Sequence, residues 1–135
     1  MKPTIAFICL GNSCRSIMAE ALARHSYGYE LTSVSAGLSP LGWVAPETLE
    51  VLAEMSIPTH GLRSKGLWEI DLPGCRVVVN LTEQELRPGL RSRFPGRVFN
   101  RHITDPFGFS LDAYRRTRDA IIRLLEQEVS LWLKS

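Results

Sequence analysis

The chain has 135 residues, 44% of them hydrophobic, which predicts a single domain over residues 1–135 with a core large enough to need neither a disulfide nor a structural metal. Its 16 basic and 14 acidic side chains give a net charge of +2, too small to indicate a nucleic-acid partner, and no apolar stretch approaches the ~20 residues that cross a membrane. Three cysteines, an odd number, do not form the paired framework of a small secreted protein, so we expect a cytoplasmic protein.

Strands and helices are expected to alternate through the first half of the chain. The apolar run Thr4–Ile8 predicts a buried strand, and the spacing of apolar residues over Ile17–His25 predicts a helix. A second short strand is expected at Leu31–Ser35, ended by Gly37. The second helix is expected over Pro46–Met55, with its proline in the first turn, where a missing N–H costs nothing.

The second half continues the alternation. The expected elements are a strand at Arg76–Leu81, a short helix opening at Glu83–Leu86 and broken at Pro88-Gly89, a strand at Arg97–Asn100, and a long helix capped by Ser110 and running to about Leu133. The whole pattern predicts an α/β fold, in which one domain holds a four-stranded parallel sheet with helices on both faces. Ligands of such sheets bind at the carboxyl ends of the strands, where the first loop lies.

That first loop carries the chemistry, and it reads Cys9-Leu10-Gly11-Asn12-Ser13-Cys14-Arg15-Ser16. Loop N–H groups and the free N–H groups of a first helical turn can surround a phosphate-sized dianion, with the positive end of the helix dipole behind them. The same field favours a thiolate at Cys9, and the planar fork of Arg15 can bind two phosphate oxygens. Gly11 and Asn12 tolerate the left-handed backbone that such a loop needs. A thiolate beneath a bound phosphate indicates a phosphatase.

The chain resembles the low-molecular-weight protein tyrosine phosphatase family in its bacterial form, and also that family's protein-arginine phosphatase and arsenate reductase relatives. Besides the loop, the resemblance rests on four segments that extend it over nearly the whole chain: Ser33–Gly37, His60–Lys65, Asp105–Gly108 and Tyr114–Asp119. It implies a phosphatase that works through a phosphocysteine intermediate and needs no metal or other cofactor. The implied partners are a phosphorylated protein substrate and inorganic phosphate or a similar oxyanion, and we expect a monomer or weak homodimer.

Site residues follow from the loop and the resemblance together. Cys9 is the expected nucleophile, Arg15 the clamp on the transition state, and Asp105 the acid that protonates the leaving group and then the base that activates water. Phe107 is the expected apolar wall for the leaving group. The phosphate-binding residues are expected to be Leu10, Gly11, Asn12, Ser13, Cys14 and Ser16. The resemblance also implies a supporting hydrogen-bond network that joins Asn12 and Ser16 to Ser35 and His60.

The sequence leaves several substrates open, and also a non-catalytic role. Phosphotyrosine in proteins is the first reading, although Gly108 stands where eukaryotic-type members carry a second aromatic residue. Ser13 occupies a position where, by the resemblance, arginine phosphatases carry a small hydroxyl residue. An arsenate reductase would need further cysteines after the third strand, and Asn80–Leu90 has none. A non-catalytic oxyanion-binding module would have lost the acid, yet Asp105 is present.

Two features near the site bear on its use. Cys14 could form a reversible disulfide with Cys9 that shields the nucleophile from over-oxidation, or it could simply line the loop. The chain is also shorter than the family usually is between Asn80 and Asp105, which trims a loop at the rim of the site. We expect that change to affect substrate selection more than chemistry.

Overall fold

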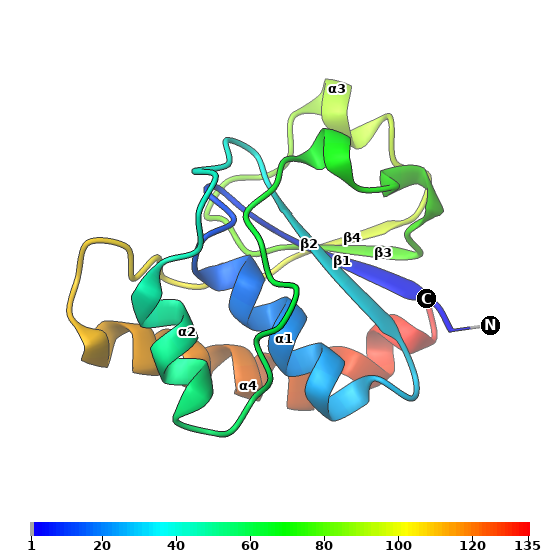
Figure 1. Cartoon of the computed structure of the whole chain (residues 1–135). Helices are drawn as coiled ribbons and strands as arrows, with labels where there is room; N and C mark the ends of the chain where they lie inside the picture. Colours follow the sequence, from blue (N-terminus) through cyan, green and yellow to red (C-terminus); the bar gives the residue numbers. More distant parts are fainter. Residues whose placement is uncertain (1) are drawn as a thin grey trace.

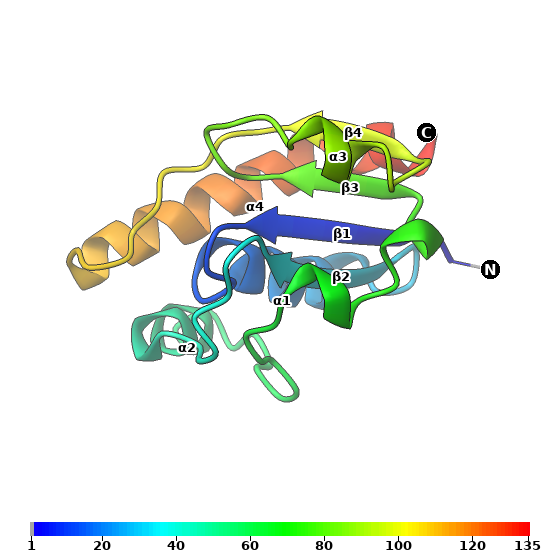
Figure 2. The same ribbon diagram turned by 90° about the horizontal axis from the view of Figure 1, so that it is seen from above.

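Four parallel strands form one sheet in the order β2-β1-β3-β4, in a computed structural model that describes residues 2–135. The strands are β1 (Thr4–Cys9), β2 (Thr32–Gly37), β3 (Val77–Asn80) and β4 (Arg97–Asn100). Figure 2 shows that the strands point the same way, so their carboxyl ends share one edge of the sheet. The two termini lie at the opposite edge.

The helices cover the two faces of the sheet unequally (Figure 1). One side carries the longer helices α1 (Arg15–Tyr27), α2 (Pro46–Ala53) and α4 (Leu111–Leu133). The other side carries only α3 (Pro88–Arg91) and the 3₁₀ turns η1 (Leu67–Glu69) and η2 (Leu72–Gly74). The predicted fold class, a four-stranded parallel sheet with helices on both faces, is therefore confirmed.

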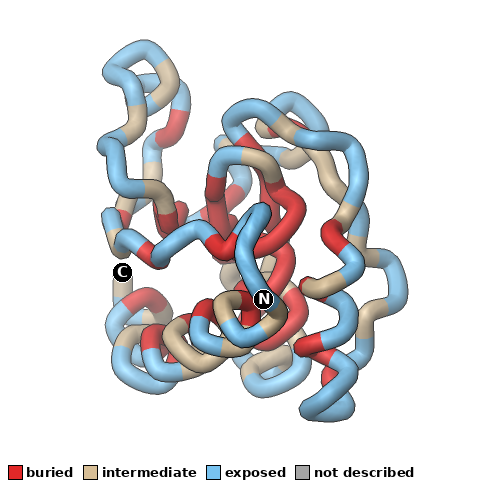
Figure 3. Tube along the Cα trace, turned by 90° about the vertical axis from the view of Figure 1, so that its left-hand side faces the viewer, coloured by how far each residue is buried: buried red, intermediate tan, exposed pale blue. Residues whose placement is uncertain are grey.

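Two apolar clusters hold these layers together, one on each face of the sheet. The larger cluster packs Phe7 of β1 and Phe99 of β4 against Trp132 of α4, whose side chain is fully buried. The smaller cluster places Ile8 and Phe94 under the short turns. Because β1 is covered on both faces, its sequence is apolar throughout rather than alternating. Figure 3 shows the buried stretches in the middle of the molecule, with exposed loops around them.

The prediction of a short helix at Glu83–Leu86 is wrong, and a helix begins at Pro88 instead. The side chains of Asn80 and Thr82 both donate to the carbonyl oxygen of Gln84, at 2.7 and 2.8 Å. Those hydrogen bonds hold the 80s segment in an irregular loop. Pro88 starts a helix rather than ending one, because its fixed φ and missing N–H suit the first helical position.

The prediction that Ser110 caps the last helix is confirmed. Ser110 caps the helix, and its hydroxyl accepts from the backbone N–H of Ala113 at 3.3 Å. The first helix is longer than expected at both ends, since it begins at Arg15 rather than Ile17 and continues to Tyr27. Arg15 therefore belongs to the first helical turn, next to the loop that precedes it.

Candidate active site

The candidate site lies at the carboxyl edge of the sheet, where the chain leaves β1 and enters α1. A pocket of about 220 Å³ opens there, and its lining residues are Cys9, Leu10, Gly11, Ser13, Cys14, Arg15, Ser39, Leu41, Asp105 and Phe107. The structure thus brings together the residues that the sequence proposes as nucleophile, clamp and acid. Asn12 and Ser16 lie behind the pocket, where both are fully buried.

The Cys9 thiol is almost fully buried and has two hydrogen-bond partners. Its Sγ lies 2.8 Å from Ser16 Oγ and accepts from the backbone N–H of Asn12 at 3.3 Å. Hydrogen bonds of this kind stabilise the thiolate relative to the thiol. Cys9 also ends β1, and only the loop of residues 10–14 separates it from the N-terminus of α1, whose free N–H groups contribute positive potential.

Burial disfavours the ionised form of the two other cysteines. Burial raises the pKa of Cys14, whose thiol donates to the Tyr114 hydroxyl at 3.7 Å. Burial likewise raises the pKa of Cys75 to about 11, and this side chain lies in the smaller apolar cluster, away from the pocket. Because a protonated thiol is a weak nucleophile, neither Cys14 nor Cys75 is favoured for attack on a bound group.

Asn12 holds the loop in shape from behind. Its φ of 48° lies in the left-handed region, which asparagine tolerates better than most residues. Its side-chain amide donates to Ser16 Oγ at 2.7 Å and to Ser35 Oγ at 3.0 Å, and its Oδ1 accepts from the backbone N–H of Lys65 at 2.8 Å. The hydrogen bonds of the amide therefore fix the backbone turn over which the pocket is built.

Arg15 is positioned by the ends of the two neighbouring strands. Its guanidinium is buried and donates to the carbonyl oxygens of Leu81 and Ile103, at 3.4 and 3.1 Å. These residues follow β3 and β4 at the carboxyl edge of the sheet. Since a guanidinium has five N–H donors, the remaining ones are available on the pocket side.

Asp105 faces Arg15 across the pocket mouth. The carboxylate lies 3.6 Å from the guanidinium, and its side chain is 47% exposed. Its Oδ1 accepts from the backbone N–H of Phe107 at 3.1 Å, which fixes the carboxylate relative to the loop. The Phe107 ring lies 5.9 Å from the ring of Trp43, so two exposed aromatic side chains stand beside the mouth.

Trp43 was not among the residues that the sequence singles out. The signal that could have found it is a large apolar side chain in a glycine-containing loop, Leu41-Gly42-Trp43, where no strand or helix would bury it. Phe107 lies where the sequence places it, beside the acid.

Ser13 forms part of the pocket wall and is tied to the N-terminus of α2. Its hydroxyl accepts from the backbone N–H of Ala45 at 3.0 Å, and its carbonyl accepts from the Thr48 hydroxyl at 2.9 Å. The side chain is almost fully buried. A larger residue at this position would fill part of the pocket or push α2 away.

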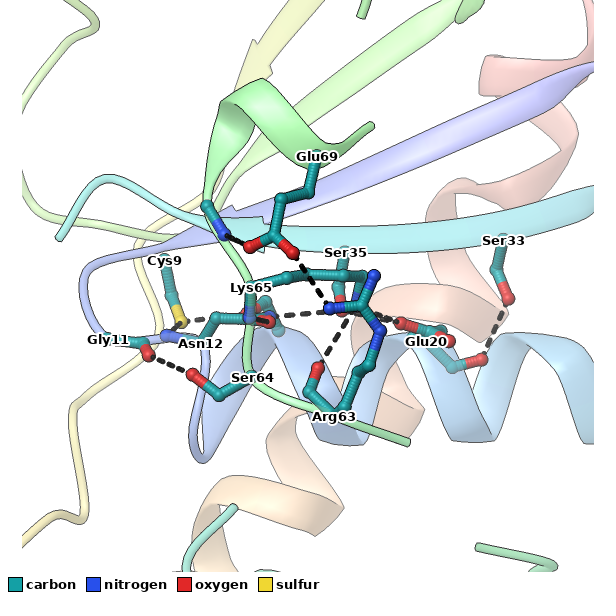
Figure 4. Close-up of polar contacts among 12 residues, drawn as sticks. Cys9, Gly11, Asn12, Glu20, Ser33, Ser35, Arg63, Ser64, Lys65 and Glu69 are labelled. Atoms are coloured by element: carbon teal, nitrogen blue, oxygen red, sulfur yellow. Dashed lines mark hydrogen bonds and ion pairs between the residues drawn. The ribbon is translucent and has the colours of Figure 1, made fainter. Parts of the chain in front are cut away.

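The predicted network includes Ser35 as expected, but His60 lies outside it. His60 is exposed in a turn next to Gly61, and among residues 2–135 no hydrogen bond joins the imidazole to the network. The residues of this stretch that do contact the loop follow His60 in the sequence, and they were not among the residues that the sequence singles out. Ser64 donates to the carbonyl of Gly11 at 3.1 Å, and Lys65 contacts Asn12 through its backbone (Figure 4).

A wider groove of about 730 Å³ adjoins the pocket and shares four of its lining residues, Leu10, Arg15, Ser39 and Asp105. Its far wall is the irregular segment that follows β3, including Glu83, Glu85 and Leu86. Over residues 2–135 we find no cluster of three or more potential metal ligands. Within the same residues, no helix combines the length and apolarity needed to cross a membrane.

Comparison with known proteins agrees with the fold. The family model for low molecular weight phosphotyrosine protein phosphatase matches residues 4–135. The chain is 34% identical to the protein-arginine-phosphatase of Bacillus subtilis over 91% of its length and 92% of that protein. It is 35% identical to arsenate reductase 2 of Staphylococcus saprophyticus, with 93% and 95% covered.

A solved structure resembles the whole chain as well. The YwlE arginine phosphatase, with a phosphorylated serine in place of its active-site cysteine, superposes with a TM-score of 0.84 at 32% identity and covers 98% of this chain and 96% of its own. The chain therefore belongs to the low molecular weight phosphotyrosine protein phosphatase family, whose members are cysteine-dependent enzymes.

Proposed function

We propose that this enzyme hydrolyses phosphomonoesters on proteins, with phosphotyrosine as the first substrate class and Cys9 as the nucleophile. One observation carries the proposal. The Cys9 sulfur, which is within hydrogen-bond distance of the Asn12 N–H and the Ser16 hydroxyl, lies in a pocket that Arg15 and Asp105 also line. A phosphoryl group in that pocket would have a thiolate on one side and a carboxyl group near its leaving oxygen.

Two steps complete the reaction. In the first, the Cys9 thiolate attacks phosphorus, an S–P bond forms, the P–O bond to the substrate breaks, and the Asp105 carboxyl gives its proton to the departing oxygen. In the second, Asp105 takes a proton from water, the oxygen of that water bonds to phosphorus, and the S–P bond breaks to restore the thiolate and release inorganic phosphate. Arg15 and the loop N–H groups stabilise the negative charge on the equatorial oxygens throughout.

Two neighbouring surfaces support a phosphotyrosine residue in a polypeptide. The exposed rings of Trp43 and Phe107 at the mouth offer an aromatic wall for a phenyl ring. The adjoining groove gives residues next to the phosphorylated side chain a place to lie. A peptide should therefore have a higher kcat/KM than free phosphotyrosine, which cannot fill the groove.

Phosphoarginine is the second candidate, and Ser13 is the observation that favours it. The side chain is small, and it lines the pocket that a guanidinium group would have to enter behind the phosphate. The relative from Bacillus subtilis named above is a protein-arginine-phosphatase. If phosphoarginine is the substrate, Asp105 protonates a departing nitrogen instead of an oxygen, and the two steps are otherwise the same.

The test measures kcat/KM for matched phosphotyrosine and phosphoarginine peptides, for free phosphotyrosine, and for arsenate with a thiol reductant. Turnover of phosphotyrosine peptide that vanishes in Cys9→Ser supports the first class. A preference for phosphoarginine that Ser13→Ile reverses supports the second, with Ser13 as the selectivity residue. Activity on arsenate alone, or phosphate binding without any turnover, would overturn both.

A further inference from the structure

Behind the phosphate-binding loop lies an ion pair that the reaction steps do not use. The Lys65 ammonium is 3.4 Å from Glu20 Oε1, and the two side chains are only 11% and 12% exposed. Lys65 also donates to Ser35 Oγ at 3.3 Å and to the carbonyl of Arg63 at 3.2 Å (Figure 4). Removing two charges from water costs free energy, so the burial of this ion pair needs an explanation.

Glu20 fixes the direction of the first hydrogen bond in the network. An ionised carboxylate can only accept, so the Ser35 hydroxyl must donate to Glu20 Oε1, which lies 2.5 Å away. The hydrogen of Ser35 is then committed, and its oxygen can only accept from Asn12 Nδ2, at 3.0 Å.

The orientation of the Asn12 amide, which leads to the nucleophile, is fixed independently of Glu20. The backbone N–H of Lys65 can only donate, so it must face Oδ1 of Asn12 and leave the amide nitrogen facing the two serines. Ser16 Oγ accepts from that nitrogen at 2.7 Å, and Cys9 Sγ lies 2.8 Å from the same oxygen. When Cys9 is ionised its sulfur can only accept, so the Ser16 hydroxyl is then the donor of this contact.

This arrangement has an electrostatic cost that Lys65 removes. An unpaired carboxylate at Glu20, behind the loop, would oppose both the thiolate and a phosphate dianion. The other charged groups facing the pocket are Arg15 and Asp105, and the thiol of Cys14 lies beside them. The Arg63–Glu69 ion pair, at 2.9 Å, is on the outer side of the same segment, where the Arg63 side chain is exposed.

We propose that the Lys65 ammonium compensates the buried Glu20 carboxylate behind the loop, and so keeps that carboxylate from opposing the Cys9 thiolate and a phosphate bound above it. The proposal rests on the proposed function only in taking Cys9 as the nucleophile. Its test needs no protein substrate, so its failure is distinguishable from failure of the substrate assignment.

The first variant is Lys65→Met, which leaves the Glu20 carboxylate unpaired. Inorganic phosphate should bind roughly three- to tenfold more weakly by titration calorimetry, because the uncompensated negative charge of Glu20 remains behind the loop. The pH profile of Cys9 alkylation by iodoacetamide should move to higher pH. Fragment-ion mass spectrometry separates labelling of Cys9 from labelling of Cys14.

The decisive variant is the double substitution Glu20→Gln with Lys65→Met, which removes both charges. We expect it to recover most of the phosphate affinity and of the alkylation profile lost in Lys65→Met. A merely structural Lys65 would instead leave the double variant at least as impaired as the single one, and that outcome would overturn the proposal.

Controls come from the same segment. Arg63→Met removes an exposed partner of Glu69 without touching the amide of Asn12, so neither readout should change. If Lys65→Met fails to fold by circular dichroism, Lys65→Gln keeps hydrogen-bond donors without the charge and is expected to give the same shift. Wild-type behaviour of a folded Lys65→Gln would also overturn the proposal.

Discussion

At the mouth of the pocket, the Asp105 carboxyl group combines two properties that a proton-transfer residue needs. It lies 3.6 Å from the Arg15 guanidinium, in reach of a group bound there, and its side chain is half exposed, so it can exchange protons with water. The hydrogen bond from the N–H of Phe107 holds the carboxylate in place. In the proposed reaction, Asp105 would therefore transfer protons between the phosphoryl group and solvent.

Replacing that group should separate chemistry from binding. For Asp105→Asn we expect kcat to fall ~10²–10⁴-fold with a substrate whose leaving group is a poor one, and much less with an aryl phosphate that leaves easily. Competitive inhibition by inorganic phosphate should change by no more than about twofold, since the loop and Arg15 are untouched. Steady-state kinetics on both substrates checks this. Equal losses on the two leaving groups would contradict the assignment of Asp105 as the acid.

Single residues also mark the limit of what the sequence could predict. Cys9, Arg15 and Asp105 were assigned from the sequence, and the structure brings them to one pocket. His60 is exposed and makes no hydrogen bond to the Asn12 network within residues 2–135, and nothing local in the sequence fixes the direction of that turn. Lys65 could not be recognised, because its contact with Asn12 spans 53 residues and depends on tertiary packing.

Among the elements, β2 and the phosphate-binding loop are in such close contact that the last residue of β2, Gly37, must be glycine. A Cβ on Gly37 would lie 2.8 Å from the carbonyl oxygen of Leu10 and 3.0 Å from the backbone nitrogen of Asn12. Real Cβ atoms essentially never come as close as the first of these distances. The end of β2 therefore sets how far the loop can move.

Gly37→Ala should consequently displace the loop. We expect kcat/KM to fall about 10–10²-fold, since small errors in the position of reacting groups are costly, together with a lower melting temperature. The matched control is Gly89→Ala in α3, where an added Cβ meets no atom within 4 Å. Kinetics and thermal melts of both variants decide the matter. A Gly37→Ala enzyme as active as Gly89→Ala would show that the contact does not constrain the loop.

Element prediction succeeded where the signal was local. The apolar run of β1, the β-branched residues of β3 and the Ser110 cap of α4 each identify an element on their own. It failed between β3 and β4, because side chains of Asn80 and Thr82 bind a carbonyl that a helix would have used. Such competition between a side chain and the backbone is hard to foresee from spacing.

On the scale of the whole molecule, an ion-pair cluster joins α2 to α4 beside the larger core. Glu54, which follows α2, lies 2.7 Å from both Arg115 and Arg118 of α4. The chain between these two helices includes the whole second half of the sheet, so the cluster connects distant parts of the fold. Hydrogen bonds from Arg115 and then Arg118 lower the pKa of Glu54 from 4.5 to about 2.

That lowered pKa predicts how the cluster affects stability as the pH changes. In the folded chain Glu54 stays ionised down to about pH 2, whereas in the unfolded chain it takes up a proton near its ordinary value of 4.5. Its contribution is therefore fully present above pH 4.5, and it is lost as the pH falls from there to about 2. Salt should weaken it, because the carboxylate is partly exposed.

Urea unfolding of wild type and Glu54→Gln, followed from pH 7 down to pH 2, tests this. The wild type should be the more stable of the two at neutral pH, and the difference should shrink through the acid range and with added salt. Glu83→Gln is the control, since Glu83 lies on the exposed loop after β3 and makes no ion pair within residues 2–135. A gap between wild type and Glu54→Gln that stayed constant with pH would mean that glutamine disturbs packing between α2 and α4, and that the carboxylate charge contributes nothing.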